Sequence, residues 1–575
     1  MKVRVLAGLL FLIPLAVIAQ STKLAPELKQ VPAGQSISVI VQYKSVPLST
    51  QVKNLPVGNA AVSAQLQLIN GLRLVIPVAA LASLAADPNV TYVSPDRRVH
   101  AHLNNAAPAV LANYAWGLGL SGTGIGVAVI DSGIHQADDL NQTGGGSRIK
   151  ASFDYTGDGL DDGYGHGTHV AGIIGGNASD SNCSVCNVTI KGIAPNVNLI
   201  SFRVLNNQGE GTESQVIQAI QAAIQLKSTY NIRVMNLSVG RPVFESYTQD
   251  PLCQAVEQAW KAGIVVVVSA GNDGRDNSAG TYGYWTIESP GNDPYVITVG
   301  AVNTKGTPDR SDDGMTSYSA KGPTAFDYIV KPDLVAPGNR VVSLYAPGQL
   351  DIQNPQNRVP LSYYENPESG NTLSNYFVLS GTSMAAGMVS GAAALMIQND
   401  PTLTPDQIKA RLMKTAYKQL PRYVSVTDGG ATYDVQADIF TVGAGYLDVQ
   451  AALSNKDKAQ GVAKSPTAAY DTTSGNVYFV ADMLTPWGQA AIWNARFPNP
   501  GTTTWATATV WGSDAFVPNS AMWGNSVTPG SAPCWGNSAM WGNSAMWGNS
   551  AMWGNSAMWG NSAMWGNGVL INGEN

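Results

Sequence analysis

Five segments of this chain are almost continuously apolar, and stretches with helical amphipathic periodicity lie between some of them. The helical stretches TESQVIQAIQAAIQLKSTY and DPLCQAVEQAWKAG separate the second from the third and the third from the fourth. Strands that are apolar on both faces and alternate with helices are typical of a parallel sheet covered by helices on both faces. The sequence therefore predicts an α/β domain over about residues 104–455. The apolar segments are GIGVAVID, NLISFRVL, IRVMNLSVG, GIVVVVSAG and YVITVGAV.

Three short strings in this domain each place one polar residue beside a glycine. VAVIDSGI contains Asp131, GHGTHVAG contains His166, and SGTSMAAG contains Ser383. An aspartate, a histidine and a serine together form an acid–base–nucleophile set, in which the histidine takes the proton of the serine hydroxyl. The order Asp, His, Ser along the chain separates this set from the other orders in which the triad recurs on unrelated folds.

With these strings the chain resembles the subtilisin-like serine peptidases, from about residue 36 to residue 455. The resemblance implies a secreted endopeptidase that needs no cofactor for catalysis, with Asp131 orienting the base His166 and Ser383 as the nucleophile. His169, in the same string as His166, is then a structural residue inside the following helix. Asn272 in SAGND matches the side-chain donor that binds the oxyanion in this family.

The resemblance also implies two edges along which an extended peptide substrate pairs. Ser238, Val239 and Gly240 match one edge, and the segment from Gly209 to Gly211 matches the other. Small residues at such edges leave room for backbone pairing, which gives affinity with little demand on the substrate sequence. The expected partners are therefore protein or peptide substrates.

Glu288 lies in ESPGNDPYVITVGAV, a string that aligns with the floor of the primary specificity pocket. A carboxylate there would favour Lys or Arg before the cleaved bond. The alternative is a glutamate in an exposed loop, because an unpaired buried carboxylate is costly.

Two features depart from the family pattern. The family usually has proline one turn after the serine, where this chain has Gly387, and a glycine inside a helix costs about 1 kcal/mol relative to alanine. The long stretch between Pro337 and Gly381, rich in Asn, Pro and Tyr, predicts an insertion near the active site.

The N-terminus has the pattern of a signal peptide. Residues 1–19 begin with two basic side chains, continue as an apolar run and end on small residues at Val17 and Ala19. A membrane anchor is the alternative, but the run is shorter than the roughly 20 residues that a membrane span needs. A secreted, extracellular protein is therefore expected, with attachment to a cell surface left open.

Residues 20–103 are predicted to form a small α+β domain of their own. SISVIVQY, INGLRLVIP and VTYVSPD predict strands, and VAALASLAADP predicts a short helix. LAADPNVTYVSPDRRV resembles the end of inhibitor-type prodomains, which implies a segment that assists folding and blocks the active site until cleavage near Leu103. An ordinary small domain is the alternative.

The C-terminal part has an unusual repeat. Residues 456–518 are weakly patterned and predict a linker or a small segment, whereas residues 519–566 keep a six-residue period of the type NSAMWG, followed by a tail of residues 567–575. In a strand, a period of six places every Trp on one side, as it would in a β-solenoid. A disordered low-complexity tail is the equal alternative. A Trp–Met face would suit attachment to a surface, a glycan or other copies of the chain.

Composition excludes some partners and leaves others open. The formal net charge of −6 is mild and unclustered, which argues against nucleic acid. For Cys183 and Cys186, in a CxxC, a local disulfide is favoured over a redox pair or half a zinc site. The run of Asp154, Asp158, Asp161 and Asp162 could hold structural calcium, but its spacing fits no loop signature, so a solvated acidic turn is favoured.

Two other functions remain as alternatives to a peptidase. In one, the chain is chiefly a surface-binding or self-assembling protein whose repeats are the main functional part. In the other it is a lipase or esterase, which the order of the motifs disfavours. Deletion of the residues after 518 would separate the first alternative from a peptidase.

Overall fold

The computed structural model divides the chain into two compact units, residues 1–100 and residues 101–575. The predicted signal peptide, the region around Leu103, Cys534 and nearly all of the repeats lie outside the described residues. The residues that the structure describes are 23–25, 28, 36–47, 61–66, 69–95, 105–142, 144–278, 280–365, 374–421, 423–428, 430–471, 476–480, 564–565 and 573–574.

The first unit contains a four-stranded antiparallel sheet in the order β2-β3-β1-β4. β1 alternates inward and outward, so that Val39 and Val41 are buried with Leu72 and Leu74 of β3 and Leu84 of the helix. The strands and the helix predicted here are confirmed, whereas β2 was not predicted. The elements are β1 (Ser36–Tyr43), β2 (Ala61–Leu66), β3 (Gly71–Pro77), η3 (Val78–Ala80), α2 (Leu81–Ala86) and β4 (Val90–Pro95).

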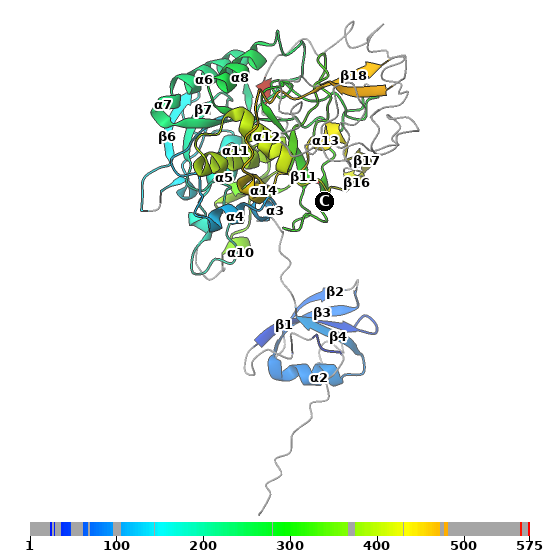
Figure 1. Ribbon diagram of the computed structural model, residues 1–575. Helices are drawn as coiled ribbons and strands as arrows, with labels where there is room; N and C mark the ends of the chain where they lie inside the picture. The colour runs from blue at the N-terminus through cyan, green and yellow to red at the C-terminus, as the bar shows by residue number, and fades with distance from the viewer. Residues whose placement is uncertain are drawn as a thin grey trace, which may run out of the picture. The chain divides into compact units, whose positions relative to one another are not determined.

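The second unit is built on an eight-stranded sheet in the order β12-β11-β10-β9-β5-β7-β6, with β13 also paired to β11 (Figure 1). All its pairings are parallel except that of β12 with β11, so the predicted parallel sheet is confirmed. The strands are β5 (Gly126–Asp131), β6 (Ile149–Asp154), β7 (Asn198–Arg203), β9 (Ile232–Leu237), β10 (Val265–Ser269), β11 (Ile297–Asn303), β12 (Gly314–Met315) and β13 (Leu334–Pro337).

Helices pack against this sheet in two groups. α5 (His166–Gly175) and α11 (Thr382–Asn399) pack on each other, and α11 also packs against β9, β10, β11 and β13. α6 (Glu213–Gln225) and α8 (Pro251–Lys261) form the other group, which contacts β5 and β10 (Figure 1). The remaining helices are α3 (Ala106–Ala109), α4 (Ala112–Gly117), α7 (Lys227–Tyr230), α9 (Gln349–Gln353), α10 (Leu361–Tyr364), α12 (Pro405–Thr415), α13 (Ile439–Val442) and α14 (Val449–Ser454), and the short 3₁₀ helices are η4 (Asp138–Leu140), η5 (Ser179–Ser181) and η6 (Pro355–Asn357).

Four two-stranded antiparallel pairs complete the unit. The stretch predicted as an insertion folds as β14, α9, η6, α10 and β15, with β14 packed on α5. The Asn187 N–H donates to the carbonyl of Tyr364 beside the disulfide, so this stretch also holds the loop that follows Cys186. The pairs are β14 (Val341–Leu344) with β15 (Tyr376–Leu379), β16 (Tyr423–Asp428) with β17 (Ala431–Gln436), β18 (Thr467–Asp471) with β19 (Asn476–Val480), and β8 (Glu210–Gly211) with β20 (Met564–Trp565).

The local disulfide predicted between Cys183 and Cys186 is confirmed. Cys253, on α8, is a buried free thiol, and burial raises its pKa well above the usual value. Within the described ranges, no helix has both the length and the hydropathy of a membrane span.

α11 is buried on all sides, from Thr382 to Ile397. Two glycines allow its close approach to neighbouring elements. A Cβ at Gly391 would lie 2.5 Å from Ile193 Cβ, and a Cβ at Gly387 would lie 3.1 Å from Ile173 Cγ2. The side chain of Ile173 thus fills the space beside Gly387.

We expect Gly391→Ala to lower the free energy of unfolding by about 1–3 kcal/mol, because Ile193 meets the new methyl group with its own Cβ. Gly387→Ala is the matched control. Its contact is the end of a branched side chain, and alanine regains about 1 kcal/mol of helix propensity, so the effect should be smaller. Denaturant unfolding of both variants measures the difference, and equal losses would contradict this account of the packing.

Candidate active site

The carboxyl end of β5 and the first turn of α5 bring Asp131 and His166 together. Asp131 Oδ1 lies 2.7 Å from His166 Nδ1, and both side chains are buried. The approach is close because residue 167 has no side chain: a Cβ at Gly167 would lie 2.2 Å from the carbonyl oxygen of Gly133. The carboxylate therefore accepts a hydrogen bond from the Nδ1–H group. In the neutral ring, the Nε2 atom then carries no proton and can accept one.

Burial and charge act on the pKa of His166 in opposite directions. Burial acts to lower the pKa of the imidazole, but the charge of Asp131, its hydrogen bond and the charge of Asp162 raise it above the usual 6.5. An aspartate on Nδ1 in this way fixes the tautomer and stabilises the imidazolium that forms when Nε2 takes a proton.

His169 is in a different environment, although it lies in the same string. Burial, followed by the neighbouring His166, lowers its pKa to about 3, so its imidazole is neutral. Its Nε2 lies 3.1 Å from the carbonyl oxygens of Val341 and Phe377, to which it donates. The structure therefore places His169 as a bridge to β14 and β15.

Asp162 is a site residue that the sequence analysis placed wrongly, in a solvated acidic turn. The carboxylate is buried, and it accepts hydrogen bonds from Ser132 Oγ at 2.8 Å, from the Gly165 N–H at 2.7 Å, and from the N–H and hydroxyl of Thr168 at 2.8 and 2.6 Å. It thus joins the turn after β5 to the start of α5. Its donors come from other parts of the chain, so the string of aspartates gave no signal of this role.

The other aspartates considered for calcium are also bound to protein groups. Asp154 accepts N–H groups of the turn that follows it, Asp158 lies 3.5 Å from the guanidinium of Arg203, and Asp161 lies 2.9 Å from His135 Nδ1. Within the described ranges, no group of three or more His, Cys, Asp or Glu side chains could hold a metal ion.

Ser383 lies in the first turn of α11, directly after Gly381 and Thr382. Its side chain is 1% exposed, and within the described part of the chain neither its Oγ nor His166 Nε2 has a hydrogen-bond partner. Buried polar atoms are normally paired, so each of these two unpaired atoms is available to a reacting group. The N-terminus of α11 adds N–H groups and a partial positive charge beside the hydroxyl.

Asn272 follows β10 and is joined to the same turn. Its Oδ1 accepts the N–H of Thr382 at 3.0 Å, which fixes which end of the amide faces the helix. The Nδ2 atom lies 3.3 Å from the position that a Cβ would take at Gly381. The amide donor of Asn272 is thereby held beside the residue that begins the turn of Ser383.

Both predicted peptide-binding edges lie between His166 and Asn272 in the chain. The segment from Ser238 to Gly240 follows β9 and is buried, and Ser238 Oγ donates to the carbonyl of Ser383 at 3.2 Å. The segment from Gly209 to Gly211 includes β8, where Gly209 has a φ of 81° and packs against the ring of Tyr164. β8 pairs with β20, from the last NSAMWG repeat.

Glu288 is half-buried rather than exposed, so it is not the exposed loop glutamate of the alternative. Its Cγ would lie 2.8 Å from a Cβ at Gly271, and its N–H donates to Ala270, so it packs under the segment that carries Asn272. Burial, followed by the charge of Asp273, raises its pKa to about 8. Within the described residues its Oε2 has no hydrogen-bond partner.

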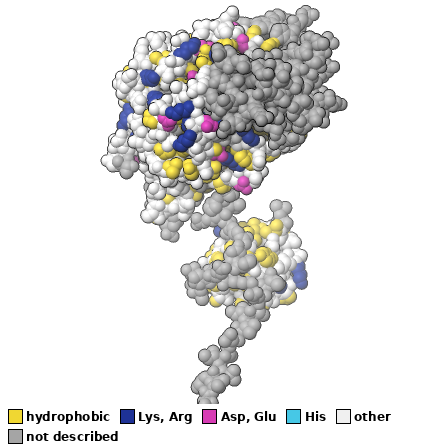
Figure 2. All heavy atoms as spheres, in the orientation of Figure 1, with side chains coloured by type: hydrophobic (Ala, Val, Ile, Leu, Met, Phe, Trp, Pro, Cys, Tyr) yellow, Lys and Arg dark blue, Asp and Glu magenta, His cyan; other side chains and the backbone are white. Residues whose placement is uncertain are grey.

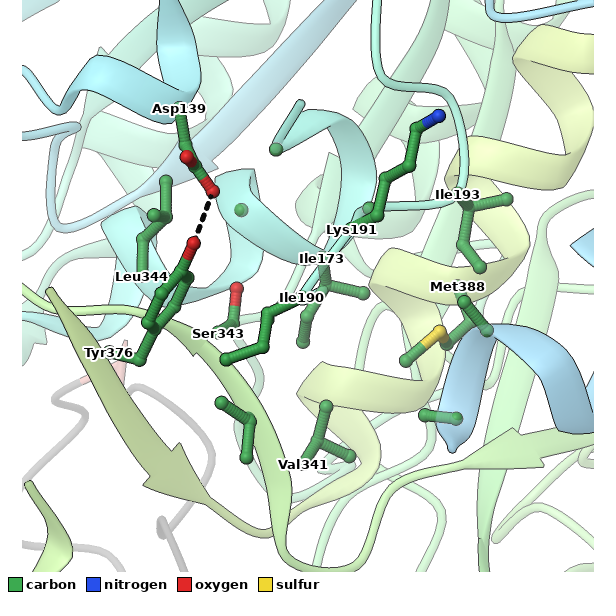
Figure 3. Close-up of a pocket in the computed structure, with 16 residues that line it drawn as sticks. Asp139, Ile173, Ile190, Lys191, Ile193, Val341, Ser343, Leu344, Tyr376 and Met388 are labelled. Carbon is green, nitrogen blue, oxygen red and sulfur yellow. Dashed lines mark hydrogen bonds between the residues drawn. The ribbon is translucent and has the colours of Figure 1, made fainter. Parts of the chain in front are cut away.

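A small cavity of about 30 Å³ is lined by residues of α5, α11 and β14 that do not include Asp131, His166 or Ser383 (Figure 3). Ile173 of α5 and Met388 of α11 line it, and the hydroxyl of Tyr376 donates to Asp139 at 3.0 Å across it. Burial raises the pKa of Asp139 to about 6. A cavity of this size holds no peptide side chain, so it does not compete with the arrangement around Ser383 as a candidate active site.

Comparison with known proteins agrees with this geometry. The profile of the Subtilase family matches residues 122–459, and the chain belongs to this family. The chain is 37% identical over 348 residues to Serine protease AprX of Bacillus subtilis, covering 59% of this chain and 72% of that protein. It is 34% identical over 310 residues to Subtilisin DY of Bacillus licheniformis, covering 54% of this chain and 89% of that protein. It is 32% identical over 359 residues to Subtilisin E of Bacillus subtilis, covering 62% of this chain and 77% of that protein.

Membership of this family makes the chain a serine endopeptidase, which hydrolyses peptide bonds in its substrates and needs no cofactor for catalysis.

Asp162→Asn should lower the free energy of unfolding by about 1.5–3 kcal/mol, because both carboxylate oxygens accept bonds and an amide would turn an NH₂ group toward one set of donors. Asp158→Asn, at a partly exposed carboxylate, is the control and should change stability little. Thermal or denaturant unfolding of the two variants measures this. An Asp162→Asn protein with the free energy of unfolding of the wild type would contradict the structural role that we assign to Asp162.

Proposed function

We propose that Asp131, His166 and Ser383 are the catalytic triad of this endopeptidase and that it acts through an acyl-enzyme intermediate. The observation that carries the proposal is the buried Asp131–His166 pair at 2.7 Å, with an unpaired Nε2 and an unpaired Ser383 Oγ within the described residues. Paired and buried histidines are common in protein cores, but here the atom that must take a proton is the one left without a partner.

The proposed reaction uses these three side chains in turn. Ser383 Oγ attacks the carbonyl carbon of the scissile bond while its proton passes to His166 Nε2, and Asp131 stabilises the imidazolium. The carbonyl oxygen becomes an oxyanion, which Asn272 Nδ2 and the N–H groups at the start of α11 would bind. His166 then gives its proton to the leaving amine, and water repeats the sequence to release the acyl group.

Asn272 is the proposed side-chain donor of the oxyanion hole. The amide oxygen is held by Thr382, so the NH₂ group cannot be exchanged with it without losing that bond. Loss of one such donor typically lowers kcat about 10²–10³-fold.

Two backbone edges would hold the substrate as an added strand. We propose Gly209 and Gly211 on one side and Ser238, Val239 and Gly240 on the other. The hydrogen bond from Ser238 Oγ to the Ser383 carbonyl joins the second edge to the proposed nucleophile. It would hold the backbone of a bound substrate at a fixed position relative to the Ser383 hydroxyl.

The first test is covalent labelling of the purified, matured protein with a fluorescent fluorophosphonate. We expect labelling of the wild type and none of Ser383→Ala, with Ser390→Ala as the control. Ser390 lies on the same helix but donates to Asn236, so it should leave labelling intact. A folded wild type that does not label would overturn the assignment of the nucleophile.

Glu288 is the proposed floor of the primary specificity pocket. Its packing against Gly271 and its buried, unpaired Oε2 support a role in binding the positive charge of a substrate side chain. With a pKa of about 8, the carboxyl is mostly protonated at pH 6.5 and mostly ionised at pH 9. Preference for a basic residue should therefore depend on pH.

We expect the ratio of kcat/KM for peptides with Arg rather than Leu before the cleaved bond to rise several-fold from pH 6.5 to pH 9. In Glu288→Gln the ratio should be low and independent of pH. Glu257→Gln, at an α8 carboxylate paired with Lys261, is the control and should keep the wild-type profile. A wild-type ratio that does not change with pH would contradict the placing of Glu288 in the pocket.

The N-terminal and C-terminal parts complete the proposal. We propose that residues 1–19 direct secretion and that residues 20–103 are an inhibitory prodomain, removed near Leu103. The sheet and core of the first unit, built without the second, support a separately folding segment. The repeats of residues 519–566 remain candidates for attachment to a surface, a glycan or other copies of the chain.

A further inference from the structure

The peptide-binding edge at β8 has a strand of this same chain paired to it. β20 pairs antiparallel to β8, with Met564 opposite Gly211 and Trp565 opposite Glu210. β20 is the short red strand in Figure 1. An added strand at an exposed sheet edge is one of the recurring ways in which proteins bind peptides. The segment is therefore bound in the manner expected of a substrate.

A second anchor of the same segment lies nine residues further on, at Glu574. Its carboxylate is buried, and it accepts the Ser317 N–H at 2.9 Å and a guanidinium N–H of Arg275 at 2.8 Å. The hydroxyl of Ser317 also donates to it. Hydrogen bonds to a charged group are roughly twice as strong as those between neutral groups.

The backbone of Glu574 is recognised as well. Its N–H donates to Asn339 Oδ1 at 2.8 Å, and Asn339 Nδ2 donates to its carbonyl at 2.7 Å. Asn339 is itself buried, and both of these bonds go to one residue of the segment. A pocket that satisfies both the side chain and the backbone of a glutamate is built for that residue, because burying a carboxylate without such partners is costly.

This carboxylate pocket adjoins the turn of the nucleophile. Arg275 lies three residues after Asn272. Asn339 follows Gly338, whose carbonyl accepts the N–H of Gly381 at 2.8 Å, immediately before the turn of Ser383. A Cβ at Gly573 would lie 2.6 Å from Ser380 Oγ, so the segment also touches the strand end that leads into that turn.

We propose that the segment from Met564 to Glu574 is an intramolecular inhibitor of the active site. Its two described ends carry the proposal: β20 occupies the edge that a substrate would use, and Glu574 fixes the segment in the pocket of Arg275, Ser317 and Asn339. The proposal rests on the proposed roles of β8 and Ser383. A tethered segment competes at an effective concentration in the millimolar range, so it excludes a weakly bound peptide without a large affinity of its own.

The test compares three forms of the matured protein: the intact chain, a deletion of residues 564–575, and Glu574→Gln. We expect deletion to raise kcat/KM for a peptide substrate, and the rate of fluorophosphonate labelling, by at least tenfold. Glu574→Gln keeps the shape but loses the charge, and should give an intermediate increase. Deletion of residues 537–560, which removes four repeats and keeps both anchors, is the control and should match the intact chain.

An experiment with a synthetic peptide of residues 561–575 distinguishes inhibition by this segment from a general effect of the deletion on the fold. Added to the protein that lacks residues 564–575, it should inhibit competitively with substrate, and the same peptide with Gln at 574 should inhibit at least tenfold more weakly. Equal labelling of intact and deleted forms, with no inhibition by the peptide, would overturn the inference and leave the proposed nucleophile standing. Absence of labelling in every form would instead contradict the proposed function.

Discussion

The close contact of α11 with α5 and its neighbours is the constraint on which the candidate site depends. His166 begins one helix and Ser383 lies in the first turn of the other, so a change in helix spacing would separate the proposed base from the proposed nucleophile. Gly387 and Gly391 allow this close contact, because a Cβ at Gly387 would lie 3.1 Å from Ile173 Cγ2 of α5 and a Cβ at Gly391 would lie 3.3 Å from the carbonyl oxygen of Ile174. A helix buried on all sides also cannot rotate or slide without opening cavities. The relative positions of His166 and Ser383 thus depend on side-chain packing between the helices, away from the two side chains themselves.

The local environment shifts the pKa values of chemically identical side chains in different directions. His166 and His169 are one helical turn apart, yet an aspartate raises the pKa of the first while burial lowers that of the second to about 3. Burial likewise raises the pKa of Glu288 to about 8. Each difference comes from the partners of the group rather than from its type. The pKa values of the two histidines therefore shift in opposite directions although both residues lie in a single short string of sequence.

The sequence predicted those parts whose signal is local. Five strands of the main sheet are apolar on both faces, namely β5, β7, β9, β10 and β11. The strings around Asp131, His166 and Ser383 are likewise short and local. The half-exposed β6 and the four-residue β13 were not predicted, because neither has a long apolar run. Asp162 was misplaced because its donors, from Ser132 to Thr168, are not visible in a run of aspartates. The pocket of Glu574 joins Ser317 and Arg275 across more than 250 residues of chain, a distance over which no periodicity operates.

The strand order of the main sheet has a consequence for the lifetime of the protein. β5 lies between β9 and β7, so each strand is held by neighbours from distant parts of the chain. Cleavage by another copy needs an extended stretch that can enter a cleft, and no central strand can be drawn out alone. Cleavage within these strands is therefore limited by how rarely the sheet opens, so the unfolding rate sets how fast another copy of the enzyme can cut them.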